Sequence, residues 1–182
     1  MSLLKIALMG NPALARRAAE IPDPSAASIR RLAANMVETT LDADGVGLAA
    51  PQVHVPVRLI VFQAPDEEGK AEENDPAVAP LSVLINPEIE VLGPETEGAW
   101  EGCLSLPGLR GFVVRPAHIR YRGFDLEGKP IAREARGLHA RVVQHETDHL
   151  DGVLYPQRIR DLRQFIFESE AKHWAAQGQS PS

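Results

Sequence analysis

The chain from residue 138 to residue 150 reads LHARVVQHETDHL, and this stretch is the most informative part of the sequence. Leu138, Val142, His145 and His149 recur at the spacing of one helical face. Residues four apart on a helix are separated by about 40° around the axis and about 6 Å along it, so His145 and His149 can reach one metal ion. Glu146 stands about 100° round from His145, where a carboxylate can take a proton from a coordinated water. The stretch therefore predicts a helix with a metal site on its inward face.

A third ligand is needed, because a catalytic metal site usually has three protein ligands. Cys103 is the only cysteine in the chain and lies in the segment EGCLS, residues 101–105, just before a Pro107-Gly108 turn. A thiolate beside a divalent cation is deprotonated at neutral pH and can bind it. A single cysteine is more often a buried apolar residue. Cys103 is therefore a candidate ligand only in combination with the histidine helix.

The segment GVGLAAPQ at residues 45–52 is the third unusual stretch. It lacks the Lys-Ser/Thr pair of a P-loop and the glycine spacing of a dinucleotide-binding loop. One interpretation is the end of a helix that runs into a strand, with glycines at positive φ. The other is a backbone that lies close to a substrate, with the Gln52 amide as a hydrogen-bond donor. The segment alone does not choose between them.

The composition indicates one ordinary soluble domain. A length of 182 residues fits one domain, and 44% hydrophobic with 24% charged residues is a typical balance. No apolar run approaches the ~20 residues that span a bilayer, so we expect no membrane contact. The lone cysteine excludes a disulfide scaffold. The N-terminal apolar run is short and is interrupted by Lys5, unlike a signal peptide, and we expect a cytoplasmic protein.

Negative charge is concentrated in one stretch. The chain carries a formal net charge of −6, and residues 64–80 hold six acidic side chains against one lysine. We expect this stretch to be a mobile acidic loop. The remainder has no basic excess, which argues against a DNA-binding or dedicated RNA-binding protein because such proteins carry a basic surface.

The hydrophobic periodicity predicts a helix, several short strands and then two helices. The first helix runs from about residue 25 to residue 41, and two more cover residues 138–150 and 161–175, before a polar tail at 177–182 that is expected to fray. This order predicts an α+β fold, with mixed or antiparallel sheets of short strands around the central HExxH helix and a helix at each end. Strands are expected at residues 57–62, 81–85, 89–92, 112–114, 119–124 and 131–133.

In this order, the three segments resemble the peptide deformylase family. The family carries G-x-G-x-A-A-x-Q, E-G-C-x-S and Q-H-E-x-D-H, and all three match in full at residues 45–52, 101–105 and 144–149. The likeness extends from about Gly10 to Leu154 and implies a single domain of this family over the whole chain, residues 1–182. It also implies an enzyme that removes the N-formyl group from the formylmethionine of newly made polypeptides and releases formate.

The resemblance implies a role for each matched residue. One divalent ion would be bound with water in its fourth position, typically Fe²⁺, with Ni²⁺, Co²⁺ or Zn²⁺ as replacements. Glu146 would act as general base and then as general acid. The side chain of Gln52 and the backbone N–H of Leu104 would stabilise the oxyanion. The implied metal ligands are Cys103, His145 and His149.

The expected partner is a formyl-methionyl peptide. Members of the family bind the methionine side chain in an apolar pocket and hold the peptide backbone as an added strand. Plain core packing is the alternative explanation for the apolar positions. The matching substrate-binding positions are Val46, Gly47, Glu101, Gly102, Leu138 and Val142.

Contact with the ribosome is a further implication, since some deformylases dock there through a C-terminal helix. From Gln157 onward this chain has four basic residues against three acidic ones, which is a poor anchor for ribosomal RNA. We therefore expect transient contact at most.

The other histidines and one arginine have no assigned role. His54 stands where the family usually has glycine. His139 is expected at the surface or the pocket rim. Arg141 is expected to be solvated or paired, or to touch a substrate carboxylate. His118 and His173 have no partner that the sequence identifies.

Two other functions compete with deformylation. A zincin-type metalloprotease would use the same histidine helix and take its third ligand downstream, with Glu168 as the candidate. A non-catalytic metal-binding or ribosome-associated module would keep the scaffold without turnover. Substitution of Cys103 distinguishes the protease from a deformylase, and release of formate distinguishes the module.

Overall fold

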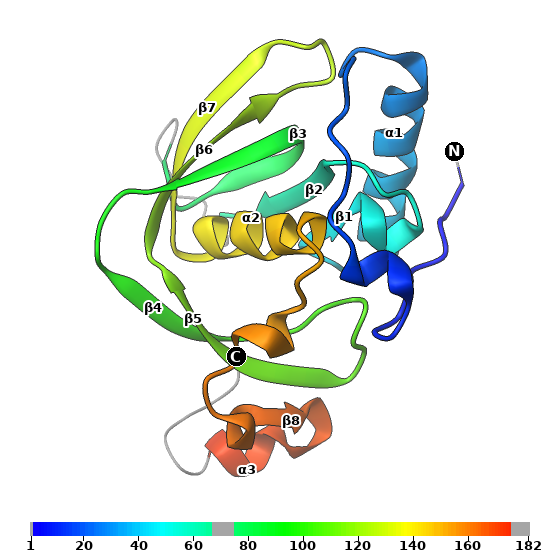
Figure 1. Ribbon diagram of the computed structural model, residues 1–182. Helices are drawn as coiled ribbons and strands as arrows, with labels where there is room; N and C mark the ends of the chain where they lie inside the picture. Colours follow the sequence, from blue (N-terminus) through cyan, green and yellow to red (C-terminus); the bar gives the residue numbers. More distant parts are fainter. Residues whose placement is uncertain (1, 67–74, 176–182) are drawn as a thin grey trace.

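The computed structural model of the chain describes residues 2–66 and 75–175 (Figure 1). It is an α+β structure with antiparallel sheets, which confirms the predicted fold class. The predicted tail at residues 177–182 and the centre of the predicted acidic loop, residues 67–74, lie outside the described residues. The helices are α1 (Ala27–Asp42), α2 (Gly137–Leu150) and α3 (Ala171–Ala175).

Two sheets hold the strands. The larger has the order β1-β2-β3-β6-β7 and the smaller has the order β4-β5-β8, with antiparallel pairing throughout. Strand β3 joins the two strands predicted at 81–85 and 89–92, and its register shifts between Ile85 and Glu88. The pattern does not predict β4, whereas β1 is the strand that one interpretation of residues 45–52 places after the first helix. The strands are β1 (Gly47–Ala49), β2 (Leu59–Ala64), β3 (Ala79–Val91), β4 (Thr96–Glu101), β5 (Leu109–Pro116), β6 (His118–Phe124), β7 (Pro130–Arg136) and β8 (Phe165–Phe167).

Helix α2 lies between the two sheets (Figure 1). It contacts strands of both, and every residue from His139 to Leu150 is buried. Polar side chains on such a helix cannot point to water, so they must find partners inside the molecule. This burial explains why the helix carries an extended network of hydrogen bonds and ion pairs. Within the described residues, no helix is long and apolar enough to cross a membrane.

Strand β2 shows how the core is divided. Its side chains alternate between the two faces of the larger sheet. Ile60 and Phe62 pack on the side of α2, whereas Leu59 and Val61 pack on the side of α1. A strand that is buried on both faces appears in the sequence as a continuous apolar run. A third cluster packs against the smaller sheet and contains Leu14, Leu106, Val113, Leu154 and Tyr155.

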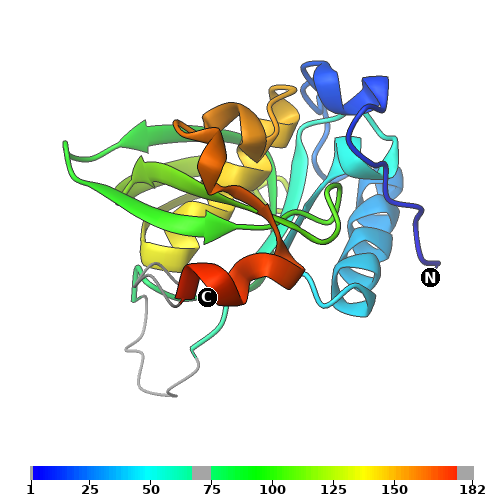
Figure 2. The same ribbon diagram turned by 90° about the horizontal axis from the view of Figure 1, so that it is seen from below.

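The helix predicted over residues 161–175 is wrong. Residues 165–167 form β8, which pairs with β5 at the edge of the smaller sheet, and only Ala171–Ala175 is α-helical (Figure 2). A short run of aromatic and β-branched residues is compatible with helix or strand, and the open edge of β5 supplies the hydrogen bonds that favour a strand. Trp174 of α3 then packs edge-on against Trp100 of β4, with ring centroids 5.5 Å apart. Ribosome contact stays a prediction, and residues 161–175 contain no long helix that would support it.

Candidate metal centre and active site

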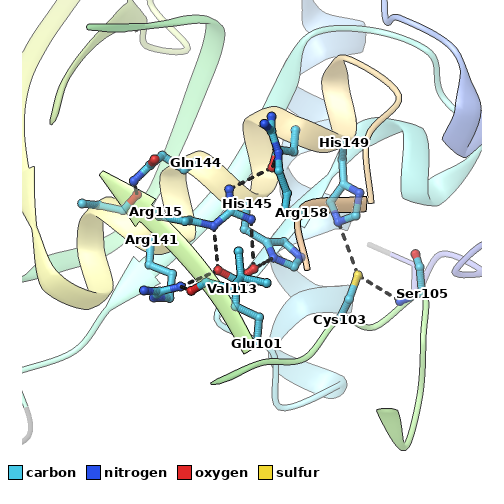
Figure 3. Close-up of polar contacts among 12 residues, drawn as sticks. Glu101, Cys103, Ser105, Val113, Arg115, Arg141, Gln144, His145, His149 and Arg158 are labelled. Atoms are coloured by element: carbon cyan, nitrogen blue, oxygen red, sulfur yellow. Dashed lines mark hydrogen bonds and ion pairs between the residues drawn. The ribbon is translucent and has the colours of Figure 1, made fainter. Parts of the chain in front are cut away.

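Three side chains from two elements meet at one point in the interior. His145 and His149 lie on successive turns of α2, and Cys103 follows β4 (Figure 3). The Cys103 Sγ lies 3.3 Å from the Nε2 of His149, and one ligand atom from each of the three residues lies within 4.8 Å of the others. A tetrahedral ion such as Zn²⁺ needs sulfur and nitrogen ligands about 3.4–3.6 Å apart. The donor set and spacing fit one metal ion.

Two of the five buried polar side-chain atoms that lack a hydrogen-bond partner among the described residues belong to residues of this region. The Nδ1 of His149 and the Oε2 of Glu146 have no hydrogen-bond partner among the described residues. Buried polar atoms are rarely left without partners unless they serve a function. His145 instead uses its Nδ1 toward Glu101, which leaves its Nε2 as the ligand atom.

Glu101 holds His145 in this orientation. The Nδ1–H of His145 donates to Glu101 Oε2 at 2.9 Å, and this bond fixes the imidazole tautomer. Arg115 donates to both carboxylate oxygens at 2.6 and 2.9 Å, and Arg141 donates to Oε1 at 2.7 Å. Burial favours the neutral acid, but the hydrogen bonds from Arg115 and His145 outweigh it and hold the pKa of Glu101 well below its usual range. Glu101 is therefore a charged residue beneath the metal ligand as well as a lining residue of the cavity.

The pKa of His145 reflects the same contacts. Burial disfavours the imidazolium, but hydrogen bonds with Cys103 and Glu101 outweigh burial and raise the pKa to about 10. In the imidazolium each ring nitrogen carries one proton, and a metal ion bound to Nε2 would replace the proton on that nitrogen.

A chain of ion pairs continues from Glu101 toward the surface. Arg115 also donates to Asp148 on α2 at 2.8 Å, and the half-exposed Arg158 donates to Asp148 at 2.6 Å (Figure 3). Arg141 donates further to the carbonyls of Val113 at 3.0 Å and Glu97 at 2.8 Å. Every buried charge in this series of ion pairs has a partner of opposite sign, and this pairing offsets the cost of burying it. None of the three arginines belongs to the motifs, so the sequence gives no signal for this arrangement.

Glu146 faces the same point from α2. It is 4% exposed, and burial raises its pKa to about 7, with Glu101 and Asp148 acting in the same direction against His145 and Arg115. A carboxyl group with a pKa near neutrality can both accept and return a proton at pH 7.

Gln52 is locked so that its amide nitrogen faces Cys103. The backbone N–H of Ala49 donates to Gln52 Oε1 at 2.8 Å, which settles the orientation of the amide. The Nε2 then donates to Ser105 Oγ at 3.1 Å and lies 3.5 Å from Cys103 Sγ. Leu104 comes directly after Cys103, and its N–H forms no hydrogen bond within residues 2–66 and 75–175. Both groups are placed as hydrogen-bond donors near the cluster.

A cavity of about 670 Å³ opens onto the cluster and is lined by Cys103, His145 and Glu146. Val142 lies inside it and is buried, whereas Val46 and Leu138 are about half exposed and lie at its rim. All of the positions expected to bind substrate line this cavity: Val46, Gly47, Glu101, Gly102, Leu138 and Val142.

The prediction that His139 lies at the surface or rim is wrong. Its ring is 0% exposed, stacks on Phe62, and is hydrogen-bonded to the Pro76 carbonyl at 3.0 Å and to the Tyr121 hydroxyl at 3.2 Å. The reason is that α2 is covered on both sides, so the residue beside the rim faces the larger sheet. Arg141, expected to be solvated or paired, is buried and paired.

The outlying residues also have their places. His118 pairs with Glu134 at 2.9 Å, His173 lies 3.5 Å from Glu170, and His54 adopts φ 65° at the end of a short 3₁₀ helix. Glu168, the third ligand of a zincin-type site, is not in the metal cluster found among the described residues and pairs with Arg110 at 2.8 Å.

Comparison with known proteins gives one consistent answer. Residues 3–165 match the family described as "Polypeptide deformylase". The chain is 53% identical over 157 residues to peptide deformylase 1 of Bordetella pertussis, which covers 86% of this chain and 88% of that protein. Its structure is similar to the crystal structure of peptide deformylase from Ehrlichia chaffeensis, with a TM-score of 0.83, 32% identity, and coverage of 90% and 91% of the two chains. The Ehrlichia chaffeensis enzyme in complex with actinonin is similar at a TM-score of 0.81, 34% identity, and coverage of 90% and 92%.

Proposed function

The chain belongs to the peptide deformylase family, whose enzymes remove the N-formyl group from new polypeptides, and we propose that it does so with one divalent ion held by Cys103, His145 and His149. The observation that carries this proposal is the convergence of one sulfur and two imidazoles beside a buried carboxyl group, in a cavity large enough for a peptide end. The mechanism below rests on the positions of these side chains.

The ligand set favours a borderline or soft ion. One thiolate and two neutral imidazoles suit Fe²⁺, Co²⁺, Ni²⁺ or Zn²⁺ better than Mg²⁺ or Ca²⁺. We propose Fe²⁺ as the native ion, in keeping with the family resemblance. When bound, such an ion would polarise the formyl oxygen as a Lewis acid and would lower the pKa of a water molecule, so that a nucleophile is available at neutral pH.

Glu146 would move the proton. In hydrolysis of the formamide, water oxygen adds to the formyl carbon, the C–N bond breaks, and the amine nitrogen must gain a proton. Glu146 Oε2 has no partner among the residues that the structure describes and the pKa of the group is about 7, so it can take a proton from the attacking water and return it to the leaving nitrogen. The products are formate and a peptide with a free N-terminal methionine.

Two donors would stabilise the negative charge that develops on the formyl oxygen. Gln52 is fixed by Ala49 and Ser105 with its amide nitrogen toward Cys103. The second donor is the N–H of Leu104, which has no acceptor among the described residues. Donors that are already oriented cost no reorganisation in the transition state, and removal of one such donor costs about 3–4 kcal/mol in other enzymes.

The methionine side chain would occupy the apolar part of the cavity. Val142 forms its interior, with Val46 and Leu138 at the rim. The main chain near Gly47 and Gly102 would hold the peptide as an added strand, because residues of β1 and β4 both line the cavity.

Release of formate from formyl-Met-Ala-Ser tests the proposal. The protein is purified anaerobically, its metal is identified by elemental analysis, and activity is measured before and after exposure to air. Activity that is lost in air together with oxidation of bound iron supports Fe²⁺. A zincin-type protease would instead cleave internal peptide bonds and release no formate. A non-catalytic module would do neither with any of Fe²⁺, Co²⁺ or Ni²⁺.

A further inference from the structure

A second cavity lies beside α2, apart from the metal cluster. Its volume is about 530 Å³, and it shares no lining residue with the cavity at the metal cluster. We propose that this second cavity binds a small oxyanion, a phosphate or a carboxylate, through Arg58, Arg158 and the hydroxyl group of Thr147. The inference goes beyond the proposed function and does not depend on it.

The second cavity forms where the C-terminal half of α2 passes between the two sheets. Residues 87–89 of β3 line it beside the register shift of that strand, and residues 114–116 of β5 line it from the smaller sheet. Arg58 directly precedes β2, and Arg158 ends the short 3₁₀ helix that follows α2. Groups from several rigid elements therefore converge on one hollow, and their positions are set by the packing of α2 against both sheets.

Thr147 gives the first indication of a ligand in the second cavity. Its side chain lines the cavity from α2, and the residue is only 8% exposed. The Oγ1 atom is buried and has no hydrogen-bond partner among the described residues, although a threonine in a helix can donate to the carbonyl four residues earlier. Buried hydroxyl groups are nearly always hydrogen-bonded. An acceptor atom inside the cavity would satisfy this hydroxyl group.

Two arginines of the lining have donors that their ion pairs do not use. Arg58 is 7% exposed, and its Nη1 donates to Asp151 at 2.7 Å. Its Nη2 reaches the Pro87 carbonyl only at 3.5 Å, and its Nε forms no hydrogen bond within residues 2–66 and 75–175. Arg158 donates to Asp148 from Nε at 3.2 Å and from Nη2 at 2.6 Å, which leaves its Nη1 without an acceptor in the described part of the chain. Guanidinium groups only donate, so their complement is an acceptor such as a phosphate or carboxylate oxygen.

The ion pairs around the second cavity have an excess of positive charge. They join five arginines to three carboxylates, which leaves two positive charges without a counter-charge. Glu88 is an exposed residue of the lining, forms no ion pair within the described residues, and offsets one of the two. The remaining potential in a partly enclosed hollow favours an anion over a cation. The five arginines are Arg17, Arg58, Arg115, Arg141 and Arg158, and the three carboxylates belong to Glu101, Asp148 and Asp151.

Titration of the zinc-loaded protein with inorganic phosphate, and separately with acetate, tests the inference. Binding is followed by the amide chemical shifts in NMR spectra recorded at constant ionic strength. We expect saturable shifts at Arg58, Ile89 and Arg158, around the second cavity. Shifts at Gly47 and Gly102 report separately on any anion that enters the cavity at the metal cluster. The probe with the lower dissociation constant shows whether the cavity prefers a phosphate or a carboxylate.

Substitutions of the lining should move the dissociation constant in opposite directions. Thr147→Val keeps the shape of the side chain and removes only the hydroxyl group, so binding should weaken about tenfold or more through the loss of a hydrogen bond to a charged group. Arg158→Gln should weaken binding by a similar factor. Glu88→Gln removes the acidic group of the lining, so binding should tighten about two- to fivefold. Arg160→Gln is the matched control, because it removes the same charge two residues from Arg158 at an exposed side chain outside the lining, and the dissociation constant should change by less than about twofold.

Three results would overturn the inference: no saturation by either probe below about 50 mM, shifts confined to the cavity at the metal cluster, or a dissociation constant that Thr147→Val leaves unchanged. The spectra without anion show whether each variant is folded. Thr147→Val removes a buried hydroxyl group that has no partner, so its fold should be retained even if Arg158→Gln disturbs the structure. The formate assay is a separate measurement, so failure of the anion site and failure of the proposed function are distinguishable.

Discussion

The backbone of Gly47 lies directly against the carboxylate of Glu146. A Cβ built on Gly47 would overlap Oε1 of Glu146 and would come within 2.8 Å of its Cγ and Cδ. Strand β1 thus forms the wall that keeps the Glu146 side chain in place, and only a hydrogen atom fits between them. This contact explains a glycine inside a buried strand, where glycine otherwise costs conformational entropy.

We expect Gly47→Ala to lower kcat by at least about 100-fold, because the added methyl group displaces the carboxylate by an ångström or more and misplacement of that size costs about two orders of magnitude. The measurement is formate release from metal-loaded protein, with the metal content determined on the same sample. Gly128→Ala is the control. Gly128 has φ +78° with nothing within 4 Å of its Cβ position, so alanine there should cost about 1 kcal/mol of stability and leave the activity intact. Full activity of Gly47→Ala would contradict this account of Glu146.

Glu146→Gln should lower turnover strongly and retain the metal. The amide has the same shape but cannot take a proton, so kcat should fall by about 10²–10⁴-fold. Metal content should stay at the wild-type level, because Glu146 is not part of the ligand cluster. Elemental analysis and the formate assay on one preparation give both quantities. Loss of metal in this variant would place Glu146 among the ligands instead.

Cys103→Ala should weaken metal binding by at least about 100-fold, since it removes one of three ligands. The measurement is competition with a chelator of known affinity. Glu168→Ala serves as the comparison, because a zincin-type site would depend on Glu168 and not on Cys103. Glu168 pairs with Arg110 and stands outside the cluster, so its loss should leave the metal affinity unchanged. The reverse pattern would favour the protease.

The parts of the site that the sequence predicts are those whose residues lie close together in the chain. His145, Glu146 and His149 share one helix, so their geometry follows from helical periodicity alone. Cys103 was one candidate ligand on chemical grounds, and only the family resemblance assigned it to the site, because no local rule brings a turn after β4 to α2. The pairing of Arg115 and Arg141 with Glu101 was not predicted for the same reason, since these contacts arise only when α2 is packed between the two sheets.

The prediction of secondary structure from the sequence is limited in the same way. Helix α1 and the apolar strand β2 are predicted nearly at their observed bounds, because their periodicity is strong. Strand β8 was predicted as helix, because its pairing with β5 depends on an edge that becomes available only in the folded molecule. Burial of His139 follows from the cover on both sides of α2, which the sequence of the helix does not reveal.

Arg141→Met should destabilise the protein by about 3–5 kcal/mol. The substitution leaves the buried Glu101 with one cation fewer and removes the donor to the carbonyls of Val113 and Glu97. Removal of one partner from a buried ion pair typically costs this much. Urea unfolding monitored by circular dichroism gives the value. Arg122→Met is the matched control, because Arg122 is 61% exposed and its pair with Glu90 spans 3.4 Å, so the cost should stay below about 1 kcal/mol. If the two substitutions lowered the free energy of unfolding equally, the buried ion pairs of Glu101 would contribute no more to stability than an exposed pair.

His139 should make the protein less stable below pH 6.5. Burial lowers the pKa of His139 to about 4. The charge of Arg133 on β7 also lowers the pKa, whereas the hydrogen bond to the Pro76 carbonyl raises it. The Nδ1–H donates to Pro76 and the Tyr121 hydroxyl can donate to Nε2, so the folded state holds a neutral ring. Above pH 6.5 the ring is neutral in both states and contributes no pH dependence. Between pH 6.5 and 4 only the unfolded chain binds the proton, so the free energy of unfolding falls as the pH falls, by on the order of 3 kcal/mol in total.

The variant His139→Gln isolates this effect. Glutamine can donate to the Pro76 carbonyl and accept from Tyr121, but it does not titrate. Urea unfolding of both proteins at a series of pH values between 4 and 7.5 should give a shallower pH dependence for the variant, while the contributions of all other groups are common to the two curves. The gap between the curves should be constant above pH 6.5 and should change steadily below it, in favour of the variant. Parallel curves over the whole range would mean that His139 takes up a proton in the folded state, and that its environment tolerates the imidazolium.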